Sequence, residues 1–249
     1  MRFIRLAPLI LTIAASARAQ TSSELIASGD RDYASMNAAS ALSHYERAAK
    51  LDPSSYEASW KASRSAVDIG SYTNDKSRRE ALFASAEQYA RKAVQLNPTD
   101  AEGHFSLARA LGKTALTQSP RGRIRYATEI RSQALECLRI DPKHGGCLHV
   151  MGMWNAEVMR LNSITRMIAK NILGGKAFGS ASWKEAVRYM EASVANDPDR
   201  IVHYLDLAEV YDDVGEKAKS RAMYEAVIRM PATDVNDRFY KEQARVALR

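Results

Sequence analysis

The chain has 249 residues, of which 46% are hydrophobic and 26% are charged, with 36 basic against 29 acidic side chains. This balance excludes a disordered chain, a collagen-like repeat and a membrane protein with several spans. The low content of glycine (12) and proline (7), together with abundant alanine, favours long helices over an all-β fold. We therefore expect an all-α protein.

The first 19 residues have the three parts of a secretory signal peptide. Arg2 and Arg5 form a basic start, residues 6–15 form an apolar stretch, and Ala17 and Ala19 flank a cleavage site before Gln20. The apolar stretch is too short to span a bilayer, which takes about 20 residues. We expect export to the periplasm or the extracellular space; a mitochondrial presequence is the alternative.

Removal of this segment takes away three arginines and no acid, so the net charge falls from +7 to +4. Such a mild charge over residues 20–249 does not indicate nucleic-acid binding.

A proline follows Asp or Asn at the end of four helical stretches. Proline cannot continue a helix and disfavours the α conformation in the residue before it, so each proline predicts the end of one helix and the start of another soon afterwards. The spacings between them are 45, 44 and 56 residues. The four are Pro53, Pro98, Pro142 and Pro198.

Residues at fixed distances from these prolines are similar in size and polarity from one repeat to the next. Closely packed helical pairs require such a pattern. The pattern resembles the tetratricopeptide repeat, a helical pair of about 34 residues. We therefore predict an all-α, tetratricopeptide-like α-solenoid of four to five helical hairpins, some extended, over residues 20–249. The columns include Tyr45, Ala90, Ala134 and Met190 before the prolines and Leu107, Met151 and Leu207 after them.

The long spacings require extra residues within the hairpins. Gly, Pro, Ser and Asn gather at residues 70–75, 113–122 and 174–182, so we expect extended turns there. The longest uninterrupted helical pattern runs over residues 148–173 and predicts a single packing helix.

Local residue patterns narrow the resemblance. The segments concerned are Tyr45-Glu46-x-Ala48, Trp60-x3-Arg64, Gly152-x-Trp154 and Trp183-Lys184-Glu185-Ala186. Together they resemble the regulator of microtubule dynamics family over about residues 37–245. The resemblance implies a tetratricopeptide-type fold. The family's eukaryotic members are associated with microtubules and mitochondrial membranes, but an exported chain would not meet cytoplasmic microtubules.

In such a stack, the first helix of each pair lines the concave side, which is where a peptide would bind. On these first helices, the residues at fixed distances after each proline are aromatic and basic at one end of the stack. They are acidic at the other end, where Glu209, Asp212 and Asp213 lie. We predict a non-catalytic scaffold that binds a partner protein or peptide in this groove. A peptide with an acidic segment or a free C-terminal carboxylate would suit the basic end of the groove. The predicted groove residues are Trp60, Arg64, Phe105, Arg109, Lys113 and His149.

Two alternatives stay open. Trp60 and Phe105 could be core residues, because aromatic stripes at helical spacing usually pack. The chain could also be an exported scaffold that self-associates or docks partners through its convex face.

Catalytic motifs are absent from the sequence: there is no Gly-rich phosphate loop, nucleophile elbow or His-Glu-x-x-His helix. We expect no enzyme activity and no cofactor. Cys137 and Cys147, on successive helices, could form a disulfide in an oxidising compartment. With His144 and His149 they could instead hold a metal, although we expect none, or Cys137 could simply be a small packing residue.

Overall fold

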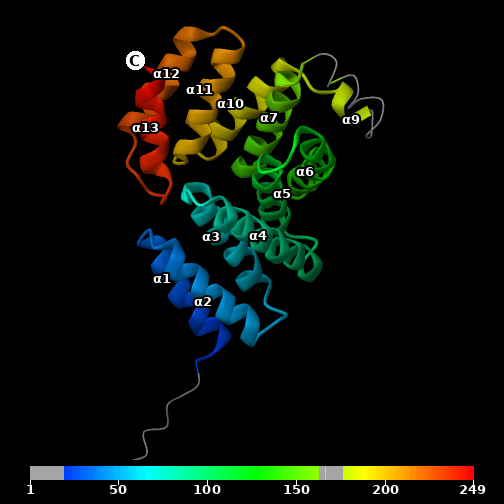
Figure 1. The fold of residues 1–249 in the computed structure, drawn as a ribbon, viewed down its shortest axis with the longest axis vertical. Coiled ribbons are helices and arrows are strands. Elements are labelled where there is room, and N and C mark those ends of the chain that lie inside the picture. Colours follow the sequence, from blue (N-terminus) through cyan, green and yellow to red (C-terminus); the bar gives the residue numbers. More distant parts are fainter. Residues whose placement is uncertain (1–19, 163–165, 167–175) are drawn as a thin grey trace, which may run out of the picture.

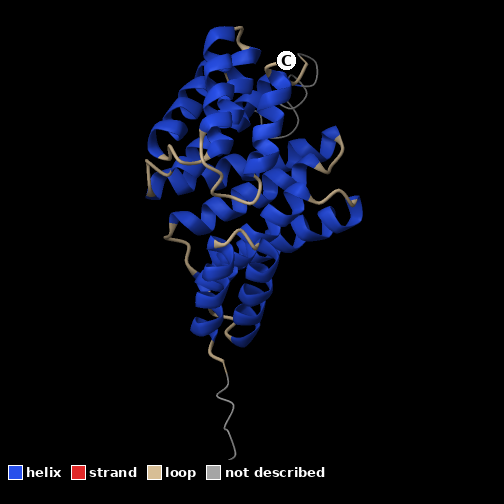
Figure 2. Cartoon of the chain, turned by 90° about the vertical axis from the view of Figure 1, so that its left-hand side faces the viewer, coloured by secondary structure: helices blue, strands red, loops and turns tan. Residues whose placement is uncertain are grey.

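The computed structural model describes residues 20–162, 166 and 176–249. All regular structure in this part of the chain is helical, without a strand (Figure 2). The helices are α1 (Ser22–Ala34), α2 (Ala38–Leu51), α3 (Tyr56–Tyr72), α4 (Lys76–Leu96), α5 (Ala101–Leu116), α6 (Pro120–Ile140), α7 (Gly145–Arg160), α9 (Lys176–Gly179), α10 (Trp183–Asn196), α11 (Ile201–Asp213), α12 (Lys217–Arg229) and α13 (Asp237–Ala247).

Apart from the short α9, the described helices pair into five hairpins, followed by the single helix α13 (Figure 1). The pairs are α1 with α2, α3 with α4, α5 with α6, α7 with α10, and α11 with α12. The predicted all-α solenoid of four to five hairpins is therefore confirmed. No described helix is long and apolar enough to cross a membrane. The predicted signal peptide lies outside the described residues.

The residue before each of the four prolines ends a helix in the expected way. Asp52, Asn97, Asp141 and Asp197 all leave the α conformation, with φ between −143° and −127° and ψ between 71° and 95°. The next helix then starts within five residues, because a side chain such as that of Ser55 caps its first turn.

Small residues let the two helices of a hairpin approach closely. A Cβ atom built on Gly29 would lie 2.5 Å from the ring of Tyr45, and one built on Gly70 would lie 2.5 Å from the ring of Phe83. The column five residues before each proline is fully buried in all four repeats. It consists of Ala48, Ala93, Cys137 and Ser193.

Two expectations about the extra residues were wrong. Three residues, Thr73–Asp75, join α3 to α4, and three join α5 to α6, so most of the extra length at these two places extends the helices. The predicted helix over 148–173 ends at Arg160, because Leu161 is extended with φ −62° and ψ 138°. Most of residues 163–175 lie outside the described part of the chain.

The two ends of the solenoid meet. Val235, in the loop before α13, packs against the hydrophobic core of the N-terminal hairpins. Phe239 of α13 stacks on Tyr72 at the end of α3, with 5.9 Å between ring centroids. Figure 1 shows this loop and α13 beside the end of α3. The C-terminal segment therefore closes the open side of the stack.

Candidate functional site: the inner row of helices

The first helices of the hairpins form an inner row, since each contacts the next in the order α1, α3, α5, α7 and α11. All six predicted groove residues lie on this row. Each is partly exposed and none is fully buried, so the aromatic side chains are not simply core residues. The six are Trp60, Arg64, Phe105, Arg109, Lys113 and His149.

Arg64 lies between two aromatic rings at the N-terminal end of the row. Its guanidinium carbon is 3.6 Å from the ring centroid of Tyr33 and 5.0 Å from that of Trp60. A cation over an aromatic face is attracted by the ring quadrupole. The rings fix the position of the Arg64 charge without neutralising it.

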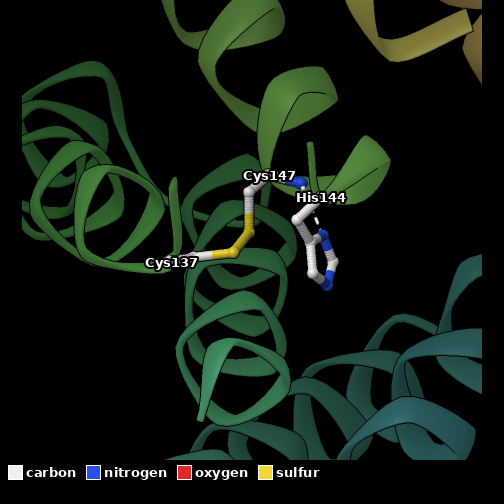
Figure 3. Close-up of side chains that lie close together, drawn as sticks. All are labelled: Cys137, His144 and Cys147. Atoms are coloured by element: carbon white, nitrogen blue, oxygen red, sulfur yellow. Dashed lines mark hydrogen bonds between the residues drawn. A yellow bond between two sulfur atoms is a disulfide. The ribbon is translucent and has the colours of Figure 1, made fainter. Parts of the chain in front are cut away.

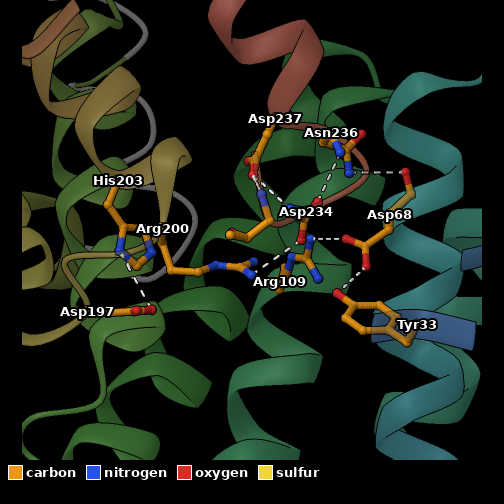
Figure 4. A network of polar contacts seen from close by, with 10 residues as sticks. Tyr33, Asp68, Arg109, Asp197, Arg200, His203, Asp234, Asn236 and Asp237 are labelled. Atoms are coloured by element: carbon orange, nitrogen blue, oxygen red, sulfur yellow. Dashed lines mark hydrogen bonds and ion pairs between the residues drawn. The ribbon is translucent and has the colours of Figure 1, made fainter. Parts of the chain in front are cut away.

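Asp68 is the centre of a buried polar network (Figure 4). Its side chain is fully buried and accepts hydrogen bonds from the Tyr33 hydroxyl at 2.9 Å and from Arg109 Nη2 at 2.5 Å. Burial and the Asp68 charge raise the pKa of Tyr33 far above its ordinary value. Arg109 is thus already paired within the chain.

Lys113 lies one helical turn beyond Arg109. It lines a cavity of about 340 Å³ together with Ser71, Lys76, Arg79, Glu80 and Thr117. Burial, and then the charge of Arg109, lower the pKa of Lys113. Within residues 20–162 and 176–249, neither Lys113 nor Arg64 forms an ion pair with an acid.

The other two predicted residues have partners inside the chain. Phe105 packs on the ring of His144, with 4.9 Å between centroids. His149 pairs with Asp206 at 2.7 Å and stacks on His203 at 4.8 Å. Burial, and then the charge of His149, lower the pKa of His203 to about 2, so His203 is neutral. These residues build the middle of the row.

The C-terminal end of the row is acidic, as predicted, but partly neutralised. Arg160 reaches Asp213 at 2.6 Å and Glu157 at 2.6 Å, and Asp212 pairs with Lys217 at 3.0 Å. Burial, and then the charge of Asp206, raise the pKa of Glu209 to about 7.

Cys137 and Cys147 are joined by a disulfide that links the end of α6 to the start of α7 (Figure 3). His144 Nδ1 accepts a hydrogen bond from the Cys147 amide at 3.2 Å and so caps α7. The cluster Cys137, His144 and Cys147 has ligand atoms within 4.8 Å of one another. With the two sulfur atoms bonded to each other, no thiolate is free to bind a metal.

Several residues of this site are not predicted by the repeat pattern. Asp68 stands fifteen residues after Pro53, the same place that Lys113 has after Pro98, so extending the columns by one turn would have found it. No column contains the remaining ones, because they belong to α1, to the cap of α11, to the loop before α13 or to the first residue of α13. These are Tyr33, Arg200, Asp234, Asn236 and Asp237.

A stack of helical hairpins in which each pair packs against the next defines a tetratricopeptide-like α-solenoid. A solved thermophilic TPR protein from Thermus thermophilus has the same fold, with a TM-score of 0.64 and 19% sequence identity over 91% of this chain and 100% of that one.

The model of the family "Regulator of microtubule dynamics protein 1-3" matches residues 25–249, so the chain belongs to this family. Bovine regulator of microtubule dynamics protein 1 is 24% identical over 141 residues, which is 56% of this chain and 44% of the relative. The mouse protein is 22% identical over the same share of this chain and 46% of its own length. The matched stretch thus covers less than half of either relative.

Proposed function

We propose that this protein is a non-catalytic interaction scaffold that binds an acidic segment of a partner protein on its inner row. The observation that carries the proposal is that neither Arg64, held against two aromatic rings, nor Lys113 forms an ion pair with an acid among the described residues. Arg–carboxylate bonds are among the strongest that a peptide can make at a protein surface.

The two cations Arg64 and Lys113 change which residues of the predicted groove we expect to contact the peptide. Arg109 was expected to bind the partner directly, but it is paired with Asp68 and so acts as a positioning residue. Trp60 and Phe105 are partly exposed on the same row and would supply apolar surface for the peptide. A preformed groove leaves most of the ordering entropy to the peptide, which is consistent with weak, micromolar binding.

A fluorescent peptide of alternating glutamate and alanine tests this proposal by anisotropy with the purified protein. We expect Arg64→Gln with Lys113→Gln to weaken binding by about tenfold or more. Because the pairing is only partly buried, binding should also weaken as salt rises to physiological strength.

The matched control is Lys92→Gln with Lys184→Gln, which removes the same charge from exposed positions on the outer helices α4 and α10. Equal losses in both double variants would show only general charge attraction. Loss of peptide binding in the control variant alone would favour docking on the convex face.

We also propose that the protein is exported through cleavage before Gln20. The Cys137–Cys147 disulfide supports this, because disulfides persist in oxidising compartments. N-terminal sequencing of the protein from its native cells should therefore start at or within a few residues of Gln20. Recovery of the intact Met1 start from cytoplasmic protein would contradict export.

A further inference from the structure

The loop before α13 behaves like a bound peptide. The chain leaves α12 at Arg229 and crosses to the other end of the inner row before α13 begins at Asp237. There Asn236 Nδ2 donates to the main-chain oxygen of Asp68 at 3.4 Å, a contact between residues 168 positions apart. Figure 4 shows this loop between Arg200 and Asp68.

The loop holds its own shape. One carboxylate oxygen of Asp237 accepts hydrogen bonds from the amides of Thr233 and Asp234, both at 2.7 Å. Asp234 Oδ1 accepts from the amide of Asn236 at 3.0 Å. An acidic turn organised by its own side chains needs little further ordering when it binds a surface.

The turn is well covered by the rest of the protein, since Asp234 is 8% exposed and Asn236 and Asp237 are 2% exposed, but among the described residues its polar contacts to other elements are confined to Asp68 and Arg200. Arg200 Nη1 lies 3.3 Å from Asp234 Oδ2, and that buried oxygen makes no hydrogen bond. Phe239 stacks on Tyr72 but remains 51% exposed. The segment is also covalently tethered to α12 and α13, which keeps its local concentration at this surface high.

We propose that the surface formed by Asp68, Tyr72 and Arg200, the docking surface, recognises an acidic turn followed by an aromatic residue. Its present occupant is the chain's own Asp234-Val235-Asn236-Asp237-Arg238-Phe239. A partner protein that presents the same pattern displaces this segment and takes its place. The docking surface uses other residues than Arg64 and Lys113, so this inference goes beyond the function proposed above.

The probe is a fluorescein-labelled peptide with the sequence of residues 231–241, added to the full-length protein. In the unmodified protein the tethered segment competes with it. In Phe239→Ala, and separately in Asp234→Asn, the competitor is weakened, so we expect the peptide to bind at least tenfold more tightly than to the unmodified protein. Addition of Arg200→Gln to either variant should abolish that gain.

A peptide of the same composition in scrambled order is the control, and circular dichroism checks that each variant is folded. Equal binding of the peptide to the unmodified and weakened proteins, or no binding to folded weakened proteins, would overturn the proposal. Dimers of the weakened variants that exclude the peptide would also overturn it, because they would assign the surface to a second copy. Binding of the glutamate peptide should be unchanged by Arg200→Gln, which separates failure of this inference from failure of the proposed function.

Discussion

At the scale of single residues, the inner row depends on how one buried carboxylate is compensated. Asp68 is fully buried, and a buried charge is tolerated only when it is paired and hydrogen-bonded. Tyr33 and Arg109 provide that compensation from the helices on either side of α3. The same pairing occupies Arg109, whereas Arg64 and Lys113 form no ion pair with an acid among the described residues.

Arg109→Met should lower the free energy of unfolding by about 3–5 kcal/mol, because it leaves the Asp68 carboxylate buried and unpaired. Replacement of both partners, Arg109→Met with Asp68→Leu, should cost less than the single change. Urea denaturation measures both. Arg139→Gln, in an exposed pair with Glu136, is the control and should change stability little. A loss below about 1 kcal/mol in Arg109→Met would contradict this account.

Glu209 gives the site a pH dependence. Its pKa of about 7 lies above the ordinary value of 4.5, so between these values the folded state holds a proton that the unfolded state loses. The stability from this group is complete below pH 4.5 and is lost as the pH rises through 7. Glu209→Gln removes the titration, so the variant should gain stability relative to the unmodified protein from pH 5 to pH 8.

Chemical denaturation at several pH values measures that difference. Asp206→Asn should lower the pKa of Glu209, which carbon NMR of the carboxyl group follows directly, because the Asp206 charge is the second cause of the shift. A carboxyl that titrates near 4.5 in the unmodified protein would remove this explanation.

At the scale of helices, the hairpins depend on close approach at particular glycines. Gly70→Ala should destabilise the protein by about 1–3 kcal/mol, because the new Cβ would lie 2.5 Å from the Phe83 ring. Gly112, in the middle of α5, has no neighbouring atom within 4 Å of a built Cβ. Gly112→Ala should therefore stabilise by up to about 1 kcal/mol. Thermal denaturation of the two variants compares them, and equal melting temperatures would contradict the packing argument.

The disulfide joins α6 to α7 across a separation of 10 residues. In the chain-entropy view, closing a loop of this size stabilises the folded state by about 3 kcal/mol. Cys137→Ser with Cys147→Ser should lose about that amount in urea denaturation. If reduction of the unmodified protein leaves its stability unchanged, the bond does not form in the purified protein.

The sequence predicts most of this helical architecture because the Asp/Asn-Pro pairs act locally. The four residues before proline leave the α conformation as expected, and the columns of small and apolar packing residues, such as those of Tyr45 and Leu107, are buried. The end of α7 could not be predicted, because the apolar periodicity continues past Leu161 although its backbone is extended. The turn-forming residues near Gly70 also led to a wrong prediction of an extended turn, since helix caps such as Asp75 confine the turn to three residues.

At the scale of the whole molecule, the loop before α13 and Phe239 pack against the N-terminal core and the end of α3. The contact of Asn236 with Asp68 joins residues 168 positions apart and depends on the curvature that accumulates over five hairpins. A pattern read within single repeats carries no information on that curvature. The sequence therefore identifies the helices of the site and their charges, whereas the segment that closes the site comes only from the structure.

Site-specific photo-crosslinking to the glutamate-alanine peptide tests the central claim most directly. A benzophenone amino acid replaces Trp60 or Phe105 on the inner row, and Ser132 or Lys184 on the exposed outer helices. We predict crosslinks from positions 60 and 105 and none from positions 132 and 184. Crosslinks from the outer positions alone would contradict binding on the inner row and assign the partner to the convex face.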